Sequence, residues 1–424
     1  MADLVLAGGT VVDATGERRV DVAVADGRIV ALGEGLEAPT VLDCGGCVIA
    51  SGLVDLAADL GEPGHEEAET VESAARAAAL GGYTAIVASP ASTPCIDDAA
   101  VVRDIQALAA GAAVEVQCAA AITIGRAGEQ LSPMAELAAL GVRLFTDAPG
   151  CVQDDRLMRR ALEYASDLGV TLAQRAESAS LAAGGHMHEG ELSARLGVPG
   201  IPAEAEELMV MRDMALVRLT GGRLHYRHLS AAGSVAIVRA ARAGGLAVTA
   251  SVTPHHLSLA DADVEPYDPA TKVVPPLRSD ADRSALRAGL IDGVIDAIAT
   301  DHTPLEAHRK EVPFDEAPPG VIGLETALAV VLTHLDLPIA RVLSAMSWAP
   351  AAIAGIDDRH GGPVTVGRPA NLCVIDPTAT WVVEGAAMAS RSANTAFEGA
   401  TLHGRVRHTI SRGEPVVIDG EAQR

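Results

Sequence analysis

Eight short apolar runs recur through the middle of the chain, and Ala-rich stretches with helical spacing lie between them. Short runs of aliphatic residues are typical of buried strands, and strands that alternate with helices form parallel β-α-β units. Eight such units predict an α/β fold of the TIM type, a (β/α)8 barrel. The predicted strands are Val48–Asp55, Thr84–Ser89, Val114–Ile122, Val142–Asp147, Val170–Glu177, Arg223–Ser230, Leu246–Pro254 and Val294–Asp301.

Three of the intervening stretches carry the clearest helical signals. Asp155–Ser166 and Ser234–Ala243 combine apolar and polar residues in a pattern that predicts helices packed against the barrel. Glu204–Glu207 gathers carboxylates, which the helix macrodipole favours in a first turn, so it predicts a helix start.

Both ends of the chain have a different pattern, in which short β-like runs are separated by Gly-containing turns. Two β-rich ends around an α/β middle predict one small β-sandwich domain built from both termini. We place this composite β-domain at residues 1–50 and 360–424, and the barrel at residues 51–359.

The charge balance narrows the classes of partner. The formal net charge is −24, and phosphate binding needs clustered Lys and Arg, so we expect no nucleic-acid partner. The beginning of the sequence lacks a basic segment followed by a long apolar run, which argues against a signal peptide. No stretch reaches the roughly 18 apolar residues of a membrane span, so we expect a cytoplasmic protein that does not bind membranes.

Polar residues follow several predicted strands, and the carboxyl ends of barrel strands are where such folds carry their chemistry. Asp55 and Asp59 belong to the first strand end, and Asp147 to the fourth. The other polar strand ends are Gln174-Arg175-Ala176-Glu177, His225-Tyr226-Arg227-His228 and Thr300-Asp301-His302. This arrangement indicates a site, or the remnant of one, at one end of the barrel.

Several specific motifs follow one another in order along the chain. They are Gly52-Leu53-Val54-Asp55, Glu62-Pro63-Gly64, Gly81-Gly82-Tyr83-Thr84, Val252-Thr253-Pro254-His255-His256-Leu257, Lys272-Val273-Val274-Pro275-Pro276-Leu277-Arg278, Ile295-Asp296-Ala297-Ile298-Ala299-Thr300-Asp301-His302 and Gly323-Leu324-Glu325-Thr326. With these motifs the chain resembles the bacterial-type dihydroorotases of the amidohydrolase superfamily over nearly its whole length. The resemblance implies a metal-bearing barrel with a small β-domain from both termini.

The metal positions of that family are only half retained. Where the family has a His-x-His pair on the first strand, this chain has Ala57 and Asp59, and Ala57 carries no donor atom. Arg175 replaces the family's histidine after the fifth strand, and a guanidinium offers no lone pair. The remaining family ligands match Asp147, His228 and Asp301.

The positions that hold substrate in the family have lost their polar groups as well. The resemblance places an Arg, two Asn and a His where this chain has Gly61, Ala91, Val274 and Leu305, so no substrate-binding position is intact. Loss of the Arg alone forfeits a charge-assisted pair with a substrate carboxylate, worth roughly 1.5–3 kcal/mol.

Arg175 also brings a permanent positive charge to the place where cations would bind. At about 5 Å and an effective dielectric constant of 20, its repulsion of a divalent ion is about 7 kcal/mol. We therefore expect Arg175 to be a site-filling cation that offsets the buried carboxylates of Asp147 and Asp301 or Asp59.

Each retained residue also has a structural interpretation. Asp301 matches the family's general base, but without metal it is a vestigial strand-end carboxylate paired with a cation. The same holds for Asp147, and His228 is either a ligand or a hydrogen-bonded pocket histidine. A second metal cluster is a less favoured interpretation of His186, His188, His255 and His256, and His302 is expected to be structural.

Two functional hypotheses follow. The first is a dihydroorotase-like pseudoenzyme of pyrimidine biosynthesis that binds no cofactor. Inactive chains of this family assemble with aspartate carbamoyltransferase, so the resemblance implies that partner, and we expect a homo-oligomer. The alternative is an active cyclic-amide hydrolase with a single zinc ion held by Asp59, Asp147, His228 and Asp301.

Overall fold

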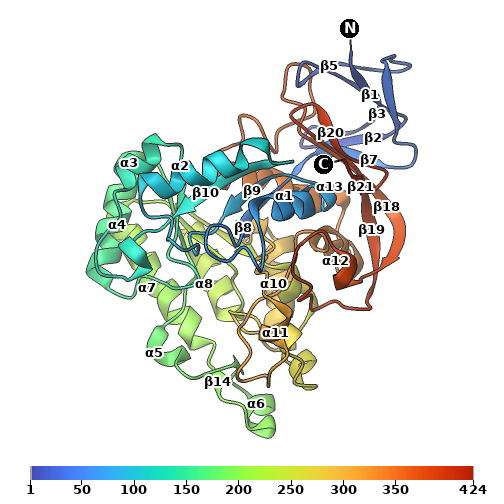
Figure 1. The fold of residues 1–424 in the computed structure, drawn as a ribbon. Coiled ribbons are helices and arrows are strands. Elements are labelled where there is room, and N and C mark those ends of the chain that lie inside the picture. The colour runs from blue at the N-terminus through green and yellow to red at the C-terminus, as the bar shows by residue number, and fades with distance from the viewer. Residues whose placement is uncertain (1, 424) are drawn as a thin grey trace.

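The predicted barrel is present in the computed structural model, which describes residues 2–423. Eight parallel strands lie side by side in chain order, and a bridge between Ala58 and His302 joins the first strand to the segment after the last (Figure 1). The fold class predicted from the sequence is therefore confirmed. The strands are β8 (Leu53–Ala58), β9 (Tyr83–Ala88), β10 (Glu115–Ala120), β11 (Leu144–Phe145), β12 (Thr171–Gln174), β15 (Leu224–Tyr226), β16 (Val248–Val252) and β17 (Ala297–Ile298).

The first predicted strand, Val48–Asp55, is in fact two strands that belong to different sheets. β7 (Val48–Ser51) pairs with strands from both ends of the chain, and β8 starts the barrel. Gly52 separates them, and a Cβ on Gly52 would lie 2.2 Å from the side chain of Thr84. Ser51 is the one polar residue before this point, and it is buried like its neighbours, so hydrophobicity alone cannot locate the break.

Helices lie around the outside of the barrel (Figure 1). The predicted helix starts are accurate within two residues, since helices begin at Asp155, Glu204 and Ala232. The longer helices are α1 (Val71–Leu80), α2 (Ala99–Leu108), α4 (Asp155–Leu168), α7 (Glu204–Thr220), α8 (Ala232–Ala243), α10 (Asp280–Ile291) and α12 (Ala327–His334). The shorter ones are α3 (Met134–Ala139), α5 (Ala179–Ala182), α6 (Glu191–Leu196), α9 (Pro254–Ser258), α11 (Ala307–Lys310), α13 (Ile339–Leu343) and α14 (Ala349–Ala354).

Local sequence explains the ends of α4. The side chain of Asp154 accepts a hydrogen bond from the backbone N–H of Leu157, which satisfies one of the unpaired donors of the first turn. Gly169 ends the helix at a φ of 67°, a left-handed conformation that glycine adopts without steric cost.

Strands from both ends of the chain form two further sheets, as the sequence pattern predicts. In Figure 1 the blue strands of the N-terminal region lie beside the red strands of the C-terminal region. One sheet is ordered β5-β4-β1-β6, and the other β21-β20-β19-β18-β7-β2-β3. Their bounds are β1 (Leu4–Ala7), β2 (Thr10–Asp13), β3 (Gly16–Arg19), β4 (Asp21–Ala25), β5 (Arg28–Gly33), β6 (Thr40–Asp43), β18 (Leu372–Val382), β19 (Thr401–Ser411), β20 (Glu414–Ile418) and β21 (Glu421–Ala422). A separate pair joins β13 (Met187–His188) to β14 (Gly200–Ile201).

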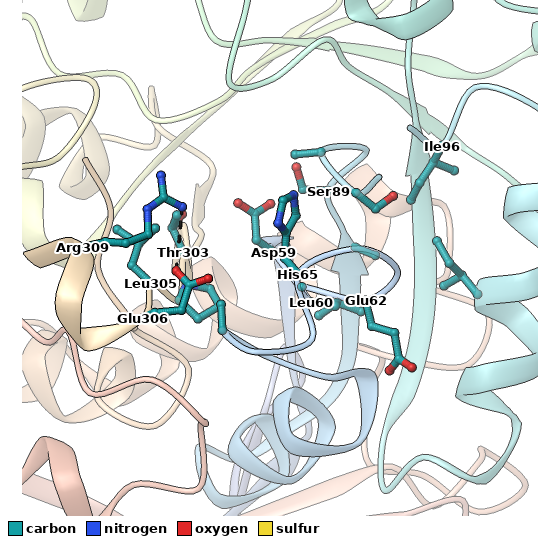
Figure 2. A pocket seen from close by; sticks show the side chains of 17 residues that line it. Asp59, Leu60, Glu62, His65, Ser89, Ile96, Thr303, Leu305, Glu306 and Arg309 are labelled. Atoms are coloured by element: carbon teal, nitrogen blue, oxygen red, sulfur yellow. Dashed lines mark ion pairs between the residues drawn. The ribbon is translucent and has the colours of Figure 1, made fainter. Parts of the chain in front are cut away.

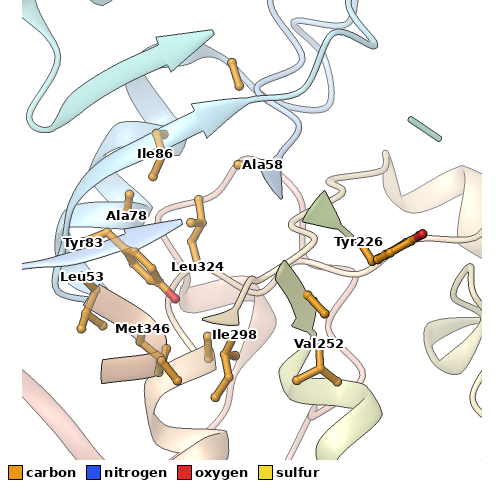
Figure 3. Packing of buried hydrophobic residues seen from close by; sticks show 14 of the residues in the cluster. Leu53, Ala58, Ala78, Tyr83, Ile86, Tyr226, Val252, Ile298, Leu324 and Met346 are labelled. Atoms are coloured by element: carbon orange, nitrogen blue, oxygen red, sulfur yellow. The ribbon is translucent and has the colours of Figure 1, made fainter. Parts of the chain in front are cut away.

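The core is built from aliphatic residues, in keeping with an aromatic content of only 2%. Figure 3 shows part of the largest cluster, in which Tyr83, Leu53 and Met346 pack near one end of β9. A second cluster is rich in small strand residues, among them Ala85, Ala119 and Ala173. Within residues 2–423, no helix is both long enough and apolar enough to cross a membrane.

Candidate functional site

Two adjoining cavities lie where the barrel strands end, with volumes of about 280 Å³ and about 170 Å³. Asp59, Ser89, Thr303, Leu305 and Arg309 line both cavities. Figure 2 shows the smaller one, with Asp59 and Ser89 on one side and Arg309 on the other. The segments after β8, β9, β15 and β17 all contribute to the larger cavity, which is the arrangement expected of a barrel site.

The structure brings most of the predicted site residues together at these cavities. Those on the larger cavity are Ala57, Asp59, Arg175, His228, Val274, Asp301 and Leu305. Those on the smaller cavity are Asp59, Gly61, Ala91 and Leu305. Asp147 lines neither of these two cavities.

The carboxylate of Asp147, which follows β11, accepts hydrogen bonds from two residues that follow β10. Its Oδ1 accepts from the backbone N–H groups of Ile122 and Thr123, at 2.8 and 3.0 Å, and its Oδ2 accepts from the Thr123 hydroxyl at 2.5 Å. Burial raises the pKa of Asp147, and these hydrogen bonds oppose that shift. In this structure the carboxylate therefore holds the segment Ile122–Thr123 through neutral donors, and not through the cation that its structural interpretation predicts.

His228 and Asp301 lie next to each other on the wall of the larger cavity. The Nδ1 of His228 lies 3.2 Å from the Oδ1 of Asp301, and both residues have positive φ, 52° and 51°. Such backbone conformations are uncommon outside glycine and often occur at functional sites. Burial raises the pKa of Asp301 to about 7 and lowers that of His228 well below its usual value. His228 is therefore neutral at pH 7, and the contact is not a full ion pair.

Asp59 stands on the wall between the two cavities (Figure 2). Burial raises its pKa, while a hydrogen bond with Ser89 and the charge of Arg227 act in the opposite direction. Gly61, which takes the place of the family's arginine, has a φ of 68°, and a Cβ there would lie 2.3 Å from the carbonyl oxygen of Glu69. A side chain at this position would strain the loop, so the loss of the arginine is built into the backbone.

Arg175 lines the larger cavity but pairs elsewhere. Its two Nη atoms lie 3.1 and 3.2 Å from the carboxylate of Glu177, and its Nε donates to the carbonyl oxygen of Pro149. Within residues 2–423 it forms no ion pair with Asp59, Asp147 or Asp301. The direct partner of Arg175 is therefore Glu177, two residues along the chain, and its charge acts on Asp301 without an ion pair, lowering the pKa of that carboxyl.

Arg227 is the residue that the sequence analysis missed. Only 4% exposed, it follows β15 and lines the larger cavity. After burial, its positive charge is the largest influence on the pKa of Asp301, and it lowers that pKa more than Arg175 does. The signal was visible in His225-Tyr226-Arg227-His228, where a charged residue stands between a buried tyrosine and a candidate ligand.

Of the other candidate histidines, four have separate partners, and the buried Nε2 of His255 has none within residues 2–423. His256 contacts the Thr253 hydroxyl at 2.7 Å and the carbonyl oxygen of Pro275 at 3.0 Å. His302 contacts the buried carboxylate of Glu69 at 3.3 Å, which agrees with a structural role. His186 and His188 lie next to Lys272 and Arg278, at 3.2 Å in each case. Nearby positive charge disfavours a cation, so these positions do not suggest a second metal site.

The donor set does not fit the metal centre that the family resemblance implies. In the described part of the chain, no group of three or more His, Cys, Asp or Glu side chains is arranged to hold a metal ion. Ala57 has no donor atom, and the carboxylate of Asp147 binds a neighbouring loop through the hydroxyl of Thr123. Arg175 and Arg227 line the cavity that a cation would enter. A cation there would meet the buried charge of Arg227, and that of Arg175 in part, since Glu177 pairs with Arg175.

Comparisons with known proteins agree on one family. A model described as Dihydro-orotase-like matches residues 46–234. Dihydroorotase of Mycobacterium tuberculosis is 47% identical over 417 residues, covering 95% of this chain and 96% of that protein. Dihydroorotase of Pelotomaculum thermopropionicum is 43% identical, covering 98% and 99%.

Solved structures extend the likeness to the fold. L-Hydantoinase from Arthrobacter aurescens has a TM-score of 0.90 and 23% identity, covering all of this chain and 98% of that one. A D-hydantoinase has a TM-score of 0.87 and 22% identity, covering 100% and 96%. At this level of identity the structures support the architecture alone.

Proposed function

The chain belongs to the dihydroorotase-like family, and from this premise we propose that it is a non-catalytic member that supports aspartate carbamoyltransferase in pyrimidine biosynthesis. Family membership rests on 43–47% identity over nearly the whole chain. The non-catalytic part of the proposal rests on the chemistry of the strand-end cavity.

One observation carries the proposal: a buried guanidinium, that of Arg227, lies on the same cavity as Asp59, His228 and Asp301. Water activation by metal needs several convergent lone pairs and a cavity that tolerates added positive charge. Here one donor position is Ala57, and two arginines supply positive charge without lone pairs. A protein that acts through its surface needs its fold but not its catalytic groups, so the fold is retained while those groups are lost.

The catalytic half of the proposal is tested by metal content and turnover. Full-length protein purified from zinc-supplemented cells should hold far less than one zinc ion per chain and should not turn over dihydroorotate, with or without added zinc. Bound zinc near one per chain, together with turnover, would overturn the proposal in favour of the alternative, a mononuclear cyclic-amide hydrolase that uses Asp59, Asp147, His228 and Asp301.

A reversion series sharpens this test. Ala57→His, Asp59→His and Arg175→His together restore the family's imidazoles, and we expect this triple variant to bind zinc weakly because Arg227 still repels it. Adding Arg227→Ala should raise the bound zinc. Equal zinc content in the triple and quadruple variants would show that Arg227 does not oppose metal.

The partner is tested separately by co-purification. The support for aspartate carbamoyltransferase is the family resemblance, together with the expectation of a homo-oligomer. Tagged protein expressed in its own cells should retain this carbamoyltransferase through size-exclusion chromatography, and the complex should persist in the Arg227→Ala variant, whose change is internal. A chain that elutes without the carbamoyltransferase at physiological ionic strength would remove this part of the proposal.

A further inference from the structure

Helix α7 carries apolar side chains on its outer side as well as on the side that faces the barrel. Its inner side contributes buried residues to the core, among them Met209 and Val210. On its outer side Leu208, Met211 and Leu219 are 48%, 47% and 61% exposed. A surface helix ordinarily carries polar residues opposite its apolar face, and a helix that is apolar on both sides is ordinarily covered on both. We therefore expect the outer side of α7 to be covered.

The neighbouring helix α4 shows the ordinary pattern. α4 and α7 pack side by side on the outside of the barrel (Figure 1), yet every exposed residue of α4 is polar. These residues are Asp155, Arg156, Arg159, Arg160, Glu163, Ser166 and Asp167. A place on the outside of the barrel therefore does not explain the apolar residues of α7. Exposed apolar patches commonly mark interaction sites.

The exposed residues of α7 lie along one line of the helix and are ordered about its middle. They are Glu204, Leu208, Met211, Ala215, Arg218 and Leu219. Steps of three or four residues keep them on one side of the helix. Glu204 lies seven residues before Met211 and Arg218 lies seven residues after it, which is about two helical turns each way. Leu208 lies three residues before Met211, and the small Ala215 lies four residues after it.

A second copy of the chain fits this line of residues when the two α7 helices pack antiparallel about a two-fold axis at Met211. In such a contact, positions equally far before and after the axis face each other. Glu204 of each copy then faces Arg218 of the other, and Leu208 packs against Ala215. Packed helices lie about 8–10 Å apart, a separation that these side chains span. Within residues 2–423, neither Glu204 nor Arg218 has an ion-pair partner of its own.

We propose that the outer side of α7 is the contact surface of a homodimer, in which the two α7 helices pack antiparallel across Met211. The acid and the base at the two ends of the line favour a second copy, because each charge then meets its opposite twice. The dimer requires neither catalysis nor the carbamoyltransferase, so it goes beyond the proposed function.

Helix α5 extends this surface. The N–H of Ser178, just before α5, donates to the carbonyl oxygen of Ala205 in the first turn of α7, and Leu181 of α5 is exposed. A 17-residue helix is about 25 Å long and about 10 Å wide, whereas a stable interface buries about 800 Å² of each partner. The contact therefore needs α5 beside α7.

The first experiment measures the mass of the purified full-length chain by analytical ultracentrifugation between about 1 and 100 μM. The unaltered chain should be a dimer at the upper concentration, and Met211→Glu should dimerise at least about tenfold more weakly, because two carboxylates would meet at the axis. Leu108→Glu on α2 is the matched control, since Leu108 is 45% exposed, and it should remain a dimer. A monomeric unaltered chain, or a Met211→Glu variant that dimerises as well as the control, would overturn the proposal.

Charge reversal tests the antiparallel arrangement. Glu204→Arg and Arg218→Glu each place like charges at both ends of the contact and should weaken the dimer about fivefold. The double variant restores opposite charges and should dimerise within about twofold of the unaltered chain. A double variant weaker than either single variant would exclude this arrangement.

A cysteine at the axis gives a readout that does not depend on affinity. Under diamide, Met211→Cys should be joined into a covalent dimer on a non-reducing gel, while the unaltered chain and Leu108→Cys should stay single. If Met211→Glu does not fold by circular dichroism, this variant decides, and the absence of the linked dimer counts against the proposal. If the α7 variants keep the mass of the unaltered chain and instead lose a co-purifying carbamoyltransferase, the surface belongs to that partner and the homodimer is refuted.

Discussion

Two aspartates, Asp55 on the first strand of the barrel and Asp301 after the last, differ in whether the protein satisfies their carboxylates with hydrogen bonds. Both oxygens of Asp55 accept hydrogen bonds from Thr300, from its N–H at 2.7 Å and its hydroxyl at 2.8 Å. Asp301 directly follows Thr300 in the chain. Its carboxylate accepts no hydrogen bond within residues 2–423 and faces the larger cavity beside His228. The framework thus satisfies its polar groups where it closes the barrel, and leaves them unsatisfied where a ligand can enter.

The largest expected effect tests the closed region. Asp55→Ala leaves the buried N–H of Thr300 without an acceptor, and its hydroxyl keeps only the longer contact, 3.3 Å, with the carbonyl oxygen of Ala57. We expect a loss of about 2 to 4 kcal/mol in the free energy of unfolding, since an unsatisfied buried group costs about 1–3 kcal/mol and a second hydrogen bond is weakened. Urea denaturation followed by circular dichroism measures it.

The matched control for this change is Asp301→Ala, which removes the same chemical group one strand end away. Because its carboxylate accepts no hydrogen bond in the described residues, we expect a loss below about 1 kcal/mol. Equal losses for the two variants would abolish the distinction between a closed framework and an unsatisfied cavity.

A second, smaller effect compares Asp147 with Asp59. Thr123→Val removes the hydroxyl that donates to Asp147 at 2.5 Å and accepts from the N–H of Gly128 at 2.9 Å. The expected loss is about 1–3 kcal/mol in the free energy of unfolding, because buried polar groups lose their partners. Ser89→Ala, which removes the partner of Asp59 on the cavity wall, should cost less. The reverse order in thermal or urea denaturation would place Asp59, and not Asp147, in the framework.

The pH dependence of stability gives a third comparison. Burial raises the pKa of Asp301 from 3.8 to about 7, so between these values the folded state holds a proton that the unfolded state has released. Stability contributed by this group is therefore present below about pH 4 and is lost as the pH rises toward 7. Asp301→Asn should flatten that decline, and we expect it to gain about 1–2 kcal/mol on the unaltered chain between pH 5 and pH 7.

Asp55 acts as the internal reference for this measurement. Burial raises the pKa of Asp55 to about 6 in the unaltered chain, and Asp55 is present in both proteins, so most of its contribution cancels when Asp301→Asn is compared with the unaltered chain at each pH. Parallel stability curves for the two proteins would mean that Asp301 is ionised in the fold throughout this range, held so by Arg227.

The sequence predicted the barrel because its evidence is repeated along the chain, where each strand has its own apolar run. Seven of the eight observed barrel strands lie within or within one residue of a predicted one, and β8 extends to Ala58, past the predicted end at Asp55. The break at Gly52 escaped because it depends on the approach of Thr84, which is distant in sequence. Residues of the site were found wherever they match a family position, as Asp59, His228 and Asp301 do.

What the sequence could not supply was the pairing of charges. Arg175 and Arg227 both lie at strand ends. Only the three-dimensional arrangement shows that Glu177 pairs with Arg175, whereas Nε and Nη1 of Arg227 have no hydrogen-bond partner within residues 2–423. Asp147 likewise matches a ligand position, but its partners at Ile122 and Thr123 come from a neighbouring strand end. A residue's type indicates what it can do, and its neighbours decide what it does.

The smallest expected effect concerns Arg309, which lines both cavities from the side opposite Asp59 (Figure 2). Its ion pair with Glu306 is long, at 3.8 Å, and its side chain is 46% exposed, so the pair is weakened by solvent. Arg309→Gln should therefore change the free energy of unfolding by less than about 0.5 kcal/mol. Thermal or urea denaturation of this variant beside the unaltered chain measures the change. A loss above about 1 kcal/mol would mean that the contact of Arg309 with Glu306 belongs to the framework that closes the cavity.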